Sequence, residues 1–121
     1  MASYSIQDIA QWVHGTVDAA DASIAVNHLV TDTRKITDPA GSVFFAIQGE
    51  HRDGHRFIPE AWQQGVRVFV VTEPGLRRQY PDGSFILVED TLRALQQLAA
   101  MHRGRFSYPV IGIAPGTYVH G

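Results

Sequence analysis

Three short, predominantly apolar runs constrain the fold of this chain more than any other feature. They are Val43–Ile47, Val66–Val71 and Phe85–Val88. Runs of this length, bounded by turn-forming residues, are typical of strands that are buried on both faces, as in a parallel sheet. A sheet of this kind needs helices to cover it. The runs therefore predict an α/β fold.

Segments with a helical spacing of apolar residues alternate with these runs. Ser5 is expected to cap the first helix, with Asp8 three residues later in an approximate capping box. Gly15 and Gly65 stand where left-handed C-caps are wanted, and Asp90 can cap the last helix. The apolar positions of the three helices are Ile6, Ile9, Ala10 and Val13; Phe57, Ile58, Ala61 and Trp62; and Leu92, Leu95, Leu98, Ala99 and Met101.

Two more strands complete the pattern. Ala25–Val30 is short and partly β-branched, and Val110–Ala114 follows the helix-ending Pro109. The expected architecture is α/β, with a small mixed or parallel sheet flanked by helices. We expect one domain over residues 3–114, followed by a divergent or foreign tail over 115–121.

Composition excludes several classes of function. The 121 residues are 45% hydrophobic and 18% charged, the balance of a soluble globular domain. A formal net charge of −2 argues against nucleic-acid binding, which usually requires a basic face. The absence of cysteine excludes disulfides and thiolate chemistry. No apolar run approaches the roughly 20 residues of a membrane span, and no signal peptide is evident. We therefore expect a cytoplasmic protein with no nucleic-acid or membrane partner.

The polar tetrad Thr31-Asp32-Thr33-Arg34 follows the first predicted strand directly. Open α/β sheets bind ligands at the carboxyl ends of their strands. The two hydroxyl groups suit a nucleobase edge or a diphosphate, and Arg34 could face an anion. The alternative is that Asp32 and Arg34 only close a turn. The residues themselves leave both interpretations open.

The second polar cluster, Gln48 to His55, follows the run Val43–Ile47. Glycines at 49 and 54 allow a close approach of the backbone to a ligand. His51, Asp53 and His55 could in principle bind a metal, but no further ligand or second shell is evident nearby. A solvated loop is the simplest alternative for this segment.

The end of the chain resembles a strand that leads into a phosphate-binding loop. Such a loop needs a glycine-rich turn that ends in Gly-Lys-Ser/Thr. Residues 115–121 instead read Pro-Gly-Thr-Tyr-Val-His-Gly, and no lysine follows Lys35. We therefore expect no catalytic residues and no cofactor in this chain, which should neither hydrolyse ATP nor form an amide bond.

Taken together, these motifs resemble the N-terminal domain of the Mur ligases, the ATP-dependent amide-bond ligases of peptidoglycan synthesis. The resemblance covers about residues 3 to 114, and its specificity lies in the order of motifs that are individually weak. In that order the motifs are Asp32-Thr33-Arg34, Pro39-Ala40-Gly41, Val43-Phe44-Phe45-Ala46, Gly49, Asp53-Gly54-His55, Ala61, Gly65 and Val68–Val71.

Within the family, the segment Val88-Glu89-Asp90-Thr91-Leu92 is most similar to the branch that adds D-alanyl-D-alanine to the UDP-muramoyl tripeptide. The branch that adds the third stem amino acid is the close alternative. Some bacteria fuse the D-alanyl-D-alanine ligase to an alanine racemase, and the opening Tyr4–Ile9 would suit such a fusion.

The resemblance implies that this domain holds the UDP end of a UDP-N-acetylmuramoyl peptide. ATP, magnesium and the incoming dipeptide would then bind to central and C-terminal domains of the full-length parent. Asp53, Gly54 and His55 would organise the loop rather than touch the ligand. The substrate-binding residues that it implies are Thr31, Asp32, Thr33, Arg34, Gln48, Gly49, Glu50, His51 and Arg52.

Two hypotheses from other classes stay open. The same fold could serve as an interaction domain that binds no small molecule. A metal hydrolase that uses His51, Asp53 and His55 is the third hypothesis, although no nucleophile accompanies these residues.

Overall fold

The computed structural model describes residues 3–49 and 53–101. The helices are α1 (Ile6–Val13), α2 (Ile58–Gln64) and α3 (Thr91–Met101). Short 3-10 turns are η1 (Thr33–Lys35), η2 (Pro39–Gly41), η3 (Gly54–Phe57) and η4 (Leu76–Arg78). The strands are β1 (Tyr4–Ser5), β2 (Thr16–Ala19), β3 (Ala25–Val26), β4 (His28–Val30), β5 (Ser42–Phe45), β6 (Val68–Val71) and β7 (Ser84–Leu87).

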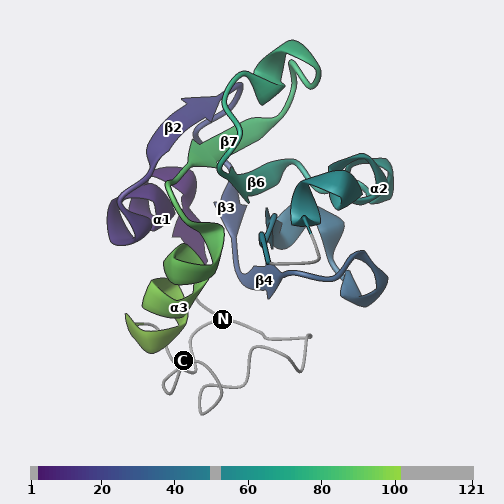
Figure 1. Ribbon diagram of the computed structural model, residues 1–121. Coiled ribbons are helices and arrows are strands. Elements are labelled where there is room, and N and C mark those ends of the chain that lie inside the picture. The colour runs from purple at the N-terminus through teal and green to yellow at the C-terminus, as the bar shows by residue number, and fades with distance from the viewer. Residues whose placement is uncertain (1–2, 50–52, 102–121) are drawn as a thin grey trace.

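A five-stranded mixed sheet forms the centre of the molecule (Figure 1), with the strand order β2-β7-β6-β5-β4. β4, β5, β6 and β7 run parallel to one another, and β2 joins the edge antiparallel to β7. A separate two-stranded sheet pairs β1 with β3. The expected α/β class with a small mixed sheet is therefore confirmed.

The two faces of the sheet have separate cores, as the alternation of side chains along a strand requires. Val43, Phe45 and Val68 point to the face that α1 and α3 cover. Phe44 and Phe69 point to the opposite face, under α2. Figure 1 shows α1 and α3 on one side of the sheet and α2 on the other. The continuous apolar runs thus reflect strands buried on both sides.

Helix α1 begins as the sequence predicts but ends one residue earlier. The Ser5 side chain accepts a hydrogen bond from the backbone N–H of Asp8 at 3.1 Å. The left-handed C-cap is His14, with φ of 57°, and not Gly15 as expected. Gly15 serves another purpose, because a Cβ at this position would lie 2.4 Å from the side chain of Ile86. The glycine allows close packing of the chain against β7.

The ends of the other two helices agree with the sequence. Gly65 caps α2 in the left-handed region, with φ of 112°. Asp90 accepts a hydrogen bond from the backbone N–H of Arg93 at 3.1 Å, which caps the first turn of α3. The C-cap of α2 fixes how this helix leads into β6, and the N-cap of α3 fixes how this helix follows β7.

The expected single strand Ala25–Val30 is divided into two. Asn27 separates β3 from β4, and its backbone N–H donates to Gly41 O at 2.9 Å instead of continuing either ladder. The chain thereby leaves the small sheet and enters the large one. The sequence does not predict the edge strand β2, because its residues alternate between exposed and half-buried and include little apolar surface.

The expected last strand, Val110–Ala114, lies outside the described residues, as do the boundary at 114 and the tail at 115–121. Among residues 3–49 and 53–101, no helix has the length and apolar character needed to cross a membrane.

Candidate functional site

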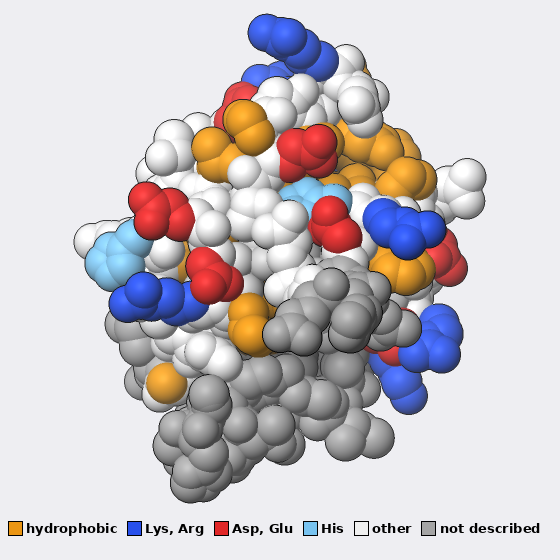
Figure 2. All heavy atoms as spheres, in the orientation of Figure 1, with side chains coloured by type: hydrophobic (Ala, Val, Ile, Leu, Met, Phe, Trp, Pro, Cys, Tyr) orange, Lys and Arg blue, Asp and Glu red, His pale blue; other side chains and the backbone are white. Residues whose placement is uncertain are grey.

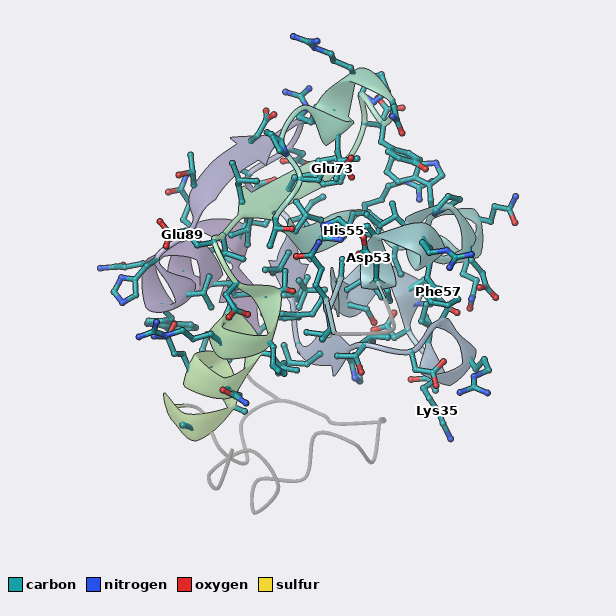
Figure 3. The ribbon with its side chains drawn as sticks, in the orientation of Figure 1. Lys35, Asp53, His55, Phe57, Glu73 and Glu89 are labelled. Carbon is teal, nitrogen blue, oxygen red and sulfur yellow. The ribbon has the colours of Figure 1, made fainter. Side chains whose placement is uncertain are left out.

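The carboxyl ends of four parallel strands meet at one edge of the sheet, which the viewer faces in Figure 3. Each strand is followed there by polar side chains. Thr31 follows β4, Gln48 lies just beyond β5, Thr72 follows β6, and Thr91 lies beyond β7. Both polar clusters that the sequence indicates therefore lie on the edge where open α/β sheets place ligands.

The cluster after β4 is a compact turn held by contacts between near neighbours. Asp32 caps η1 by accepting the backbone N–H of Arg34 at 2.9 Å. The Arg34 guanidinium also donates to the same carboxylate, with Nη2 2.8 Å from Oδ2. The hydrogen bond from the Arg34 side chain is the main reason that the pKa of Asp32 falls to about 2. The side chain of Arg34 remains 77% exposed.

The two threonines of this turn differ in exposure. Thr31 is half-buried at the end of β4, whereas Thr33 is 5% exposed. The backbone of Thr33 is tied to helix α2, because Gln64 Nε2 donates to Thr33 O at 2.8 Å. The turn is thus anchored to the helix that covers this face of the sheet.

The cluster after β5 is built around His55. The backbone N–H of Thr72 donates to His55 Nε2 at 3.1 Å, so Nε2 is the acceptor nitrogen of the ring. The ring proton consequently resides on Nδ1, 2.6 Å from Asp53 Oδ1. Burial acts to raise the pKa of Asp53, but the hydrogen bonds from His55 outweigh it and lower that pKa below its ordinary value. The His55 side chain is only 7% exposed.

Gly54 allows this loop to lie directly against the end of β5. Its backbone N–H donates to Ile47 O at 2.7 Å. A Cβ on Gly54 would lie 2.6 Å from Ile47 N and 2.8 Å from Ala46 C. These are backbone atoms that follow a central strand, so they cannot move aside easily. In the Asp-Gly-His sequence, Asp53 caps η3 and Gly54 allows the backbone to lie close to the end of β5. The buried ring of His55 accepts a hydrogen bond from Thr72, which follows β6.

Gln48 links this loop to the end of β6 and to the start of α3. Its backbone N–H donates to Thr91 Oγ1 at 3.3 Å, and its side-chain Oε1 accepts from Thr72 Oγ1 at 3.1 Å. Gln48 also forms an isolated antiparallel bridge with Asp53. Gln48, Asp53 and His55 are candidates from the sequence, whereas Thr72 and Thr91 are not. The rule that singles out Thr31, a polar residue after a buried strand, would have found both threonines.

Three expected substrate-binding residues, Glu50, His51 and Arg52, lie outside the described residues. The metal hypothesis for His51, Asp53 and His55 therefore cannot be traced through His51. Among the residues that the structure does describe, no group of three or more His, Cys, Asp and Glu side chains converges as a metal site would.

Acidic side chains flank His55 on this face. Figure 2 shows two red side chains on either side of a histidine near the centre of the view, and Figure 3 identifies them as Glu73 and Asp53. Glu73 is exposed. Like charges repel, so a diphosphate would avoid this part of the edge.

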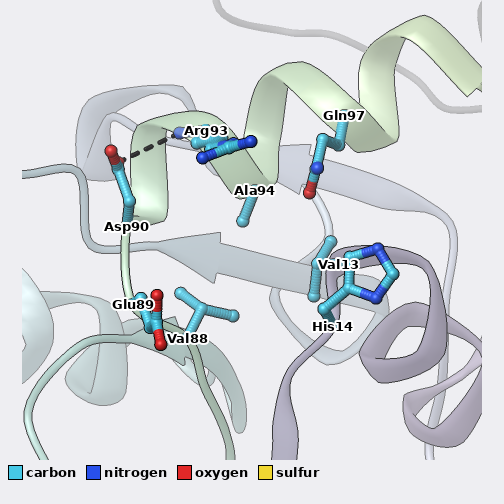
Figure 4. A pocket seen from close by; sticks show the side chains of 8 residues that line it. All are labelled: Val13, His14, Val88, Glu89, Asp90, Arg93, Ala94 and Gln97. Atoms are coloured by element: carbon cyan, nitrogen blue, oxygen red, sulfur yellow. Dashed lines mark hydrogen bonds between the residues drawn. The ribbon is translucent and has the colours of Figure 1, made fainter.

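A cavity of about 380 Å³ lies at the far end of the same edge, beside the start of α3 (Figure 4). Its apolar floor is buried, and its rim carries side chains of both charges. The lining residues are Val13, His14, Val88, Glu89, Asp90, Arg93, Ala94 and Gln97.

Comparison with known proteins identifies the family. The model of the Mur ligase family, catalytic domain, matches residues 25–103 of this chain. The chain belongs to the Mur ligase family. The match begins at β3 and includes both polar clusters, so the family resemblance indicated by the sequence motifs is confirmed.

Individual relatives agree with this assignment. A UDP-N-acetylmuramoyl-tripeptide–D-alanyl-D-alanine ligase of Synechocystis sp. is 42% identical over 90 residues, 74% of this chain and 19% of the relative. A UDP-N-acetylmuramoyl-L-alanyl-D-glutamate–2,6-diaminopimelate ligase of Geobacter sulfurreducens is 34% identical over 111 residues, 89% of this chain and 21% of the relative.

A solved structure has the same fold. The crystal structure of MurF from Acinetobacter baumannii superposes with a TM-score of 0.71 at 26% identity, covering 85% of this chain and 22% of that one. The chain thus spans about a fifth of the length of the Mur ligases that it matches.

Proposed function

We propose that this chain is the part of a peptidoglycan-precursor ligase that binds the UDP end of the substrate. The parent enzyme would add D-alanyl-D-alanine to UDP-N-acetylmuramoyl tripeptide, the reaction named for the Synechocystis relative. The observation that carries this proposal is the polar edge of the sheet, where the neighbouring strands β4 and β5 are followed by the half-buried Thr31 and by the exposed Gly49.

The chemistry of this edge suits a uridine nucleotide. Hydroxyl groups at Thr31 and Thr33 can donate to or accept from uracil and diphosphate oxygens. The exposed Gly49 leaves its backbone accessible without a side chain in the way. The carboxylates near His55 disfavour the diphosphate there, so we place Asp53 and His55 in support of the loop rather than in contact with the ligand.

ATP and magnesium belong, on this proposal, to the central and C-terminal domains of the parent. The described residues offer no set of side chains that fits a magnesium site. Residues 110–121, whose sequence invites comparison with a phosphate-binding loop, lie outside the described part of the chain. We therefore assign this chain the binding of one end of the substrate and derive no catalytic step for it.

The test is a titration of the chain with UDP-N-acetylmuramoyl tripeptide, followed by amide NMR. Saturable shifts are expected at residues 31–34 and 48–55, with weak affinity because the rest of the substrate would contact other domains. Muramoyl tripeptide without UDP is the control and should shift neither cluster. Shifts confined to α3, or no saturable shift at millimolar ligand, would count against the site and favour an interaction domain.

A second candidate is the ligase that adds the third stem amino acid. The relative from Geobacter sulfurreducens, named for diaminopimelate, supports it. Both candidates share the UDP end of the substrate, so binding to this chain does not separate them. The full-length parent does: product formed from UDP-N-acetylmuramoyl tripeptide and D-alanyl-D-alanine supports the first candidate. Product formed only from the dipeptide substrate and a diamino acid supports the second.

A further inference from the structure

We propose that Thr91 and Thr72 are positioning residues that set the substrate loop through Gln48. The inference rests on the proposed function, because it concerns how the loop that would receive the UDP compound is held in place. Neither threonine lies in either polar cluster of the sequence. Both lie at the carboxyl edge, one after β6 and the other at the start of α3.

Thr91 holds the backbone of the loop. It is the first residue of α3 and is 1% exposed. Its Oγ1 lies 3.3 Å from the backbone nitrogen of Gln48, 43 residues away in the sequence, and accepts the hydrogen bond. Because Thr91 is buried, water cannot readily replace this acceptor. The hydroxyl group therefore fixes the position of the Gln48 backbone.

Thr72 contacts the side chain of Gln48 and the ring of His55. Its hydroxyl donates to Gln48 Oε1 at 3.1 Å, and its backbone N–H donates to His55 Nε2 at 3.1 Å. One residue at the end of β6 thus contacts both the outgoing and the returning side of the loop. The backbone of Gln48 also forms an isolated antiparallel bridge with that of Asp53, so Gln48 is held from both sides.

The consequence concerns the next residue, Gly49. Gln48 is held by its backbone and by its side chain, so the direction in which the chain continues into Gly49 is set by β6 and α3. A glycine backbone alone would not supply such a direction, because glycine adopts many conformations. The two threonines thereby pre-organise the backbone groups offered to the ligand, which reduces the ordering cost of binding.

The test compares Thr91→Val with Thr91→Ser. Valine is nearly isosteric but removes the acceptor, whereas serine keeps it. Affinity for UDP-N-acetylmuramoyl tripeptide should fall about threefold to tenfold in Thr91→Val, the effect of one neutral hydrogen bond, and recover in Thr91→Ser. Thr72→Val and Thr72→Ser should behave in the same way.

Ser42→Ala is the matched control. Ser42 is 1% exposed at the start of β5, on the opposite edge, and its hydroxyl donates to Asp38 O at 2.6 Å. Its loss should leave the affinity unchanged. Equal affinity of Thr91→Val and the unaltered chain would overturn the proposal. A failure of serine to restore binding, or an equal loss in Ser42→Ala, would also overturn it.

Hydrogen exchange of the Gln48 amide, measured without ligand, separates this inference from the proposed function. Exchange should be faster in Thr91→Val than in the unaltered chain and return to normal in Thr91→Ser. If the unaltered chain binds no UDP compound, the proposed function fails, and this exchange still decides whether Thr91 positions Gln48. Unchanged exchange in Thr91→Val would refute the positioning role.

Discussion

The two polar segments at the carboxyl edge are built in different ways. The side chains of the turn after β4 bond within the turn, as in the contacts of Asp32 with Arg34, and one longer-range bond from Gln64 ties the backbone of the turn to α2. The loop after β5 is held by contacts with residues 17 to 43 positions away, as in the bonds from Thr72 to His55 and from Gln48 to Thr91. Only the loop requires β5, β6 and β7 to be in register.

This difference has a consequence for stability. A turn whose polar side chains bond to one another depends little on the rest of the sheet, and its loss should change the packing of the sheet little. A loop whose partners lie after β6 and at the start of α3 depends on the whole sheet, and its loss leaves the buried hydroxyl group of Thr91 without its partner. Substitutions in the loop should therefore cost more stability than substitutions in the turn.

The largest expected effect is that of Gly54→Ala. The added Cβ would meet Ile47 N at 2.6 Å and Ala46 C at 2.8 Å, both of them backbone atoms. We expect a loss of about 3 kcal/mol in the free energy of unfolding, measured by urea denaturation. Gly75→Ala is the control, because Gly75 has φ of 80° and a Cβ added there would meet no atom within 4 Å. That variant should lose only about 1 kcal/mol from backbone strain. Equal losses in the two variants would contradict this assignment.

The second effect is that of His55→Ala. The substitution removes a side chain that is 7% exposed and leaves the Thr72 N–H without its acceptor. A loss of about 2 kcal/mol is expected in the same assay. His14→Asn is the control, since His14 is an exposed left-handed C-cap and asparagine tolerates that conformation. Should both variants unfold at the same urea concentration, His55 would not be the link we describe.

Thr33→Val tests the turn for binding rather than for stability. Thr33 is 5% exposed, and valine has nearly the same shape, so the fold should persist. If the hydroxyl group contacts the UDP compound, affinity should fall roughly threefold to tenfold in a titration. An affinity equal to that of the unaltered chain would remove Thr33 from the site. Thr33→Ser keeps the hydroxyl group and should retain binding.

The smallest effect is expected at Asp32. Its pKa in the folded chain is about 2, below the ordinary value of an aspartate. The ion pair with Arg34 therefore stabilises the fold fully above about pH 4, and this contribution is lost as the pH falls through about 2. Because the Arg34 side chain is 77% exposed, solvent screens the pair and its contribution should be small. Asp32→Asn should be slightly less stable than the unaltered chain at neutral pH, and the difference should vanish as the pH falls through about 2. A constant difference across this range would contradict the pairing.

Much of the central sheet can be predicted from the sequence, because its strands are buried on both faces. Val68–Val71, Phe85 and Ile86 are apolar on both faces of the sheet, so their prediction needs no knowledge of the topology. The edge strand Thr16–Ala19 is different. Its side chains are half-buried on one face and exposed on the other, so its polar composition resembles that of a loop.

Two errors have a common cause. The sequence predicts a left-handed conformation at Gly15, but this glycine supplies space beside Ile86 instead. Asn27 lies within an apolar stretch and ends a strand because its N–H bonds to Gly41 O. Both roles depend on residues that are distant in the sequence. The local pattern around each position is compatible with either outcome.

The same limit applies to the site. The turn at Asp32 and Arg34 can be proposed from four consecutive residues. Thr72 and Thr91 cannot be linked to Gln48 in this way, because 24 and 43 residues separate the partners. Only the parallel order of β5, β6 and β7 brings these three residues together.

The edges of the central sheet have a consequence for how copies of this chain meet. Unpaired edge strands are templates on which another chain can add a strand and start an aggregate. One edge, β4, is only three residues long. The other, β2, carries the exposed Asp18, whose carboxylate pairs with Arg77 at 3.2 Å. A short strand and a charged one are poor templates, so neither edge of the sheet formed by the described residues favours growth by strand addition.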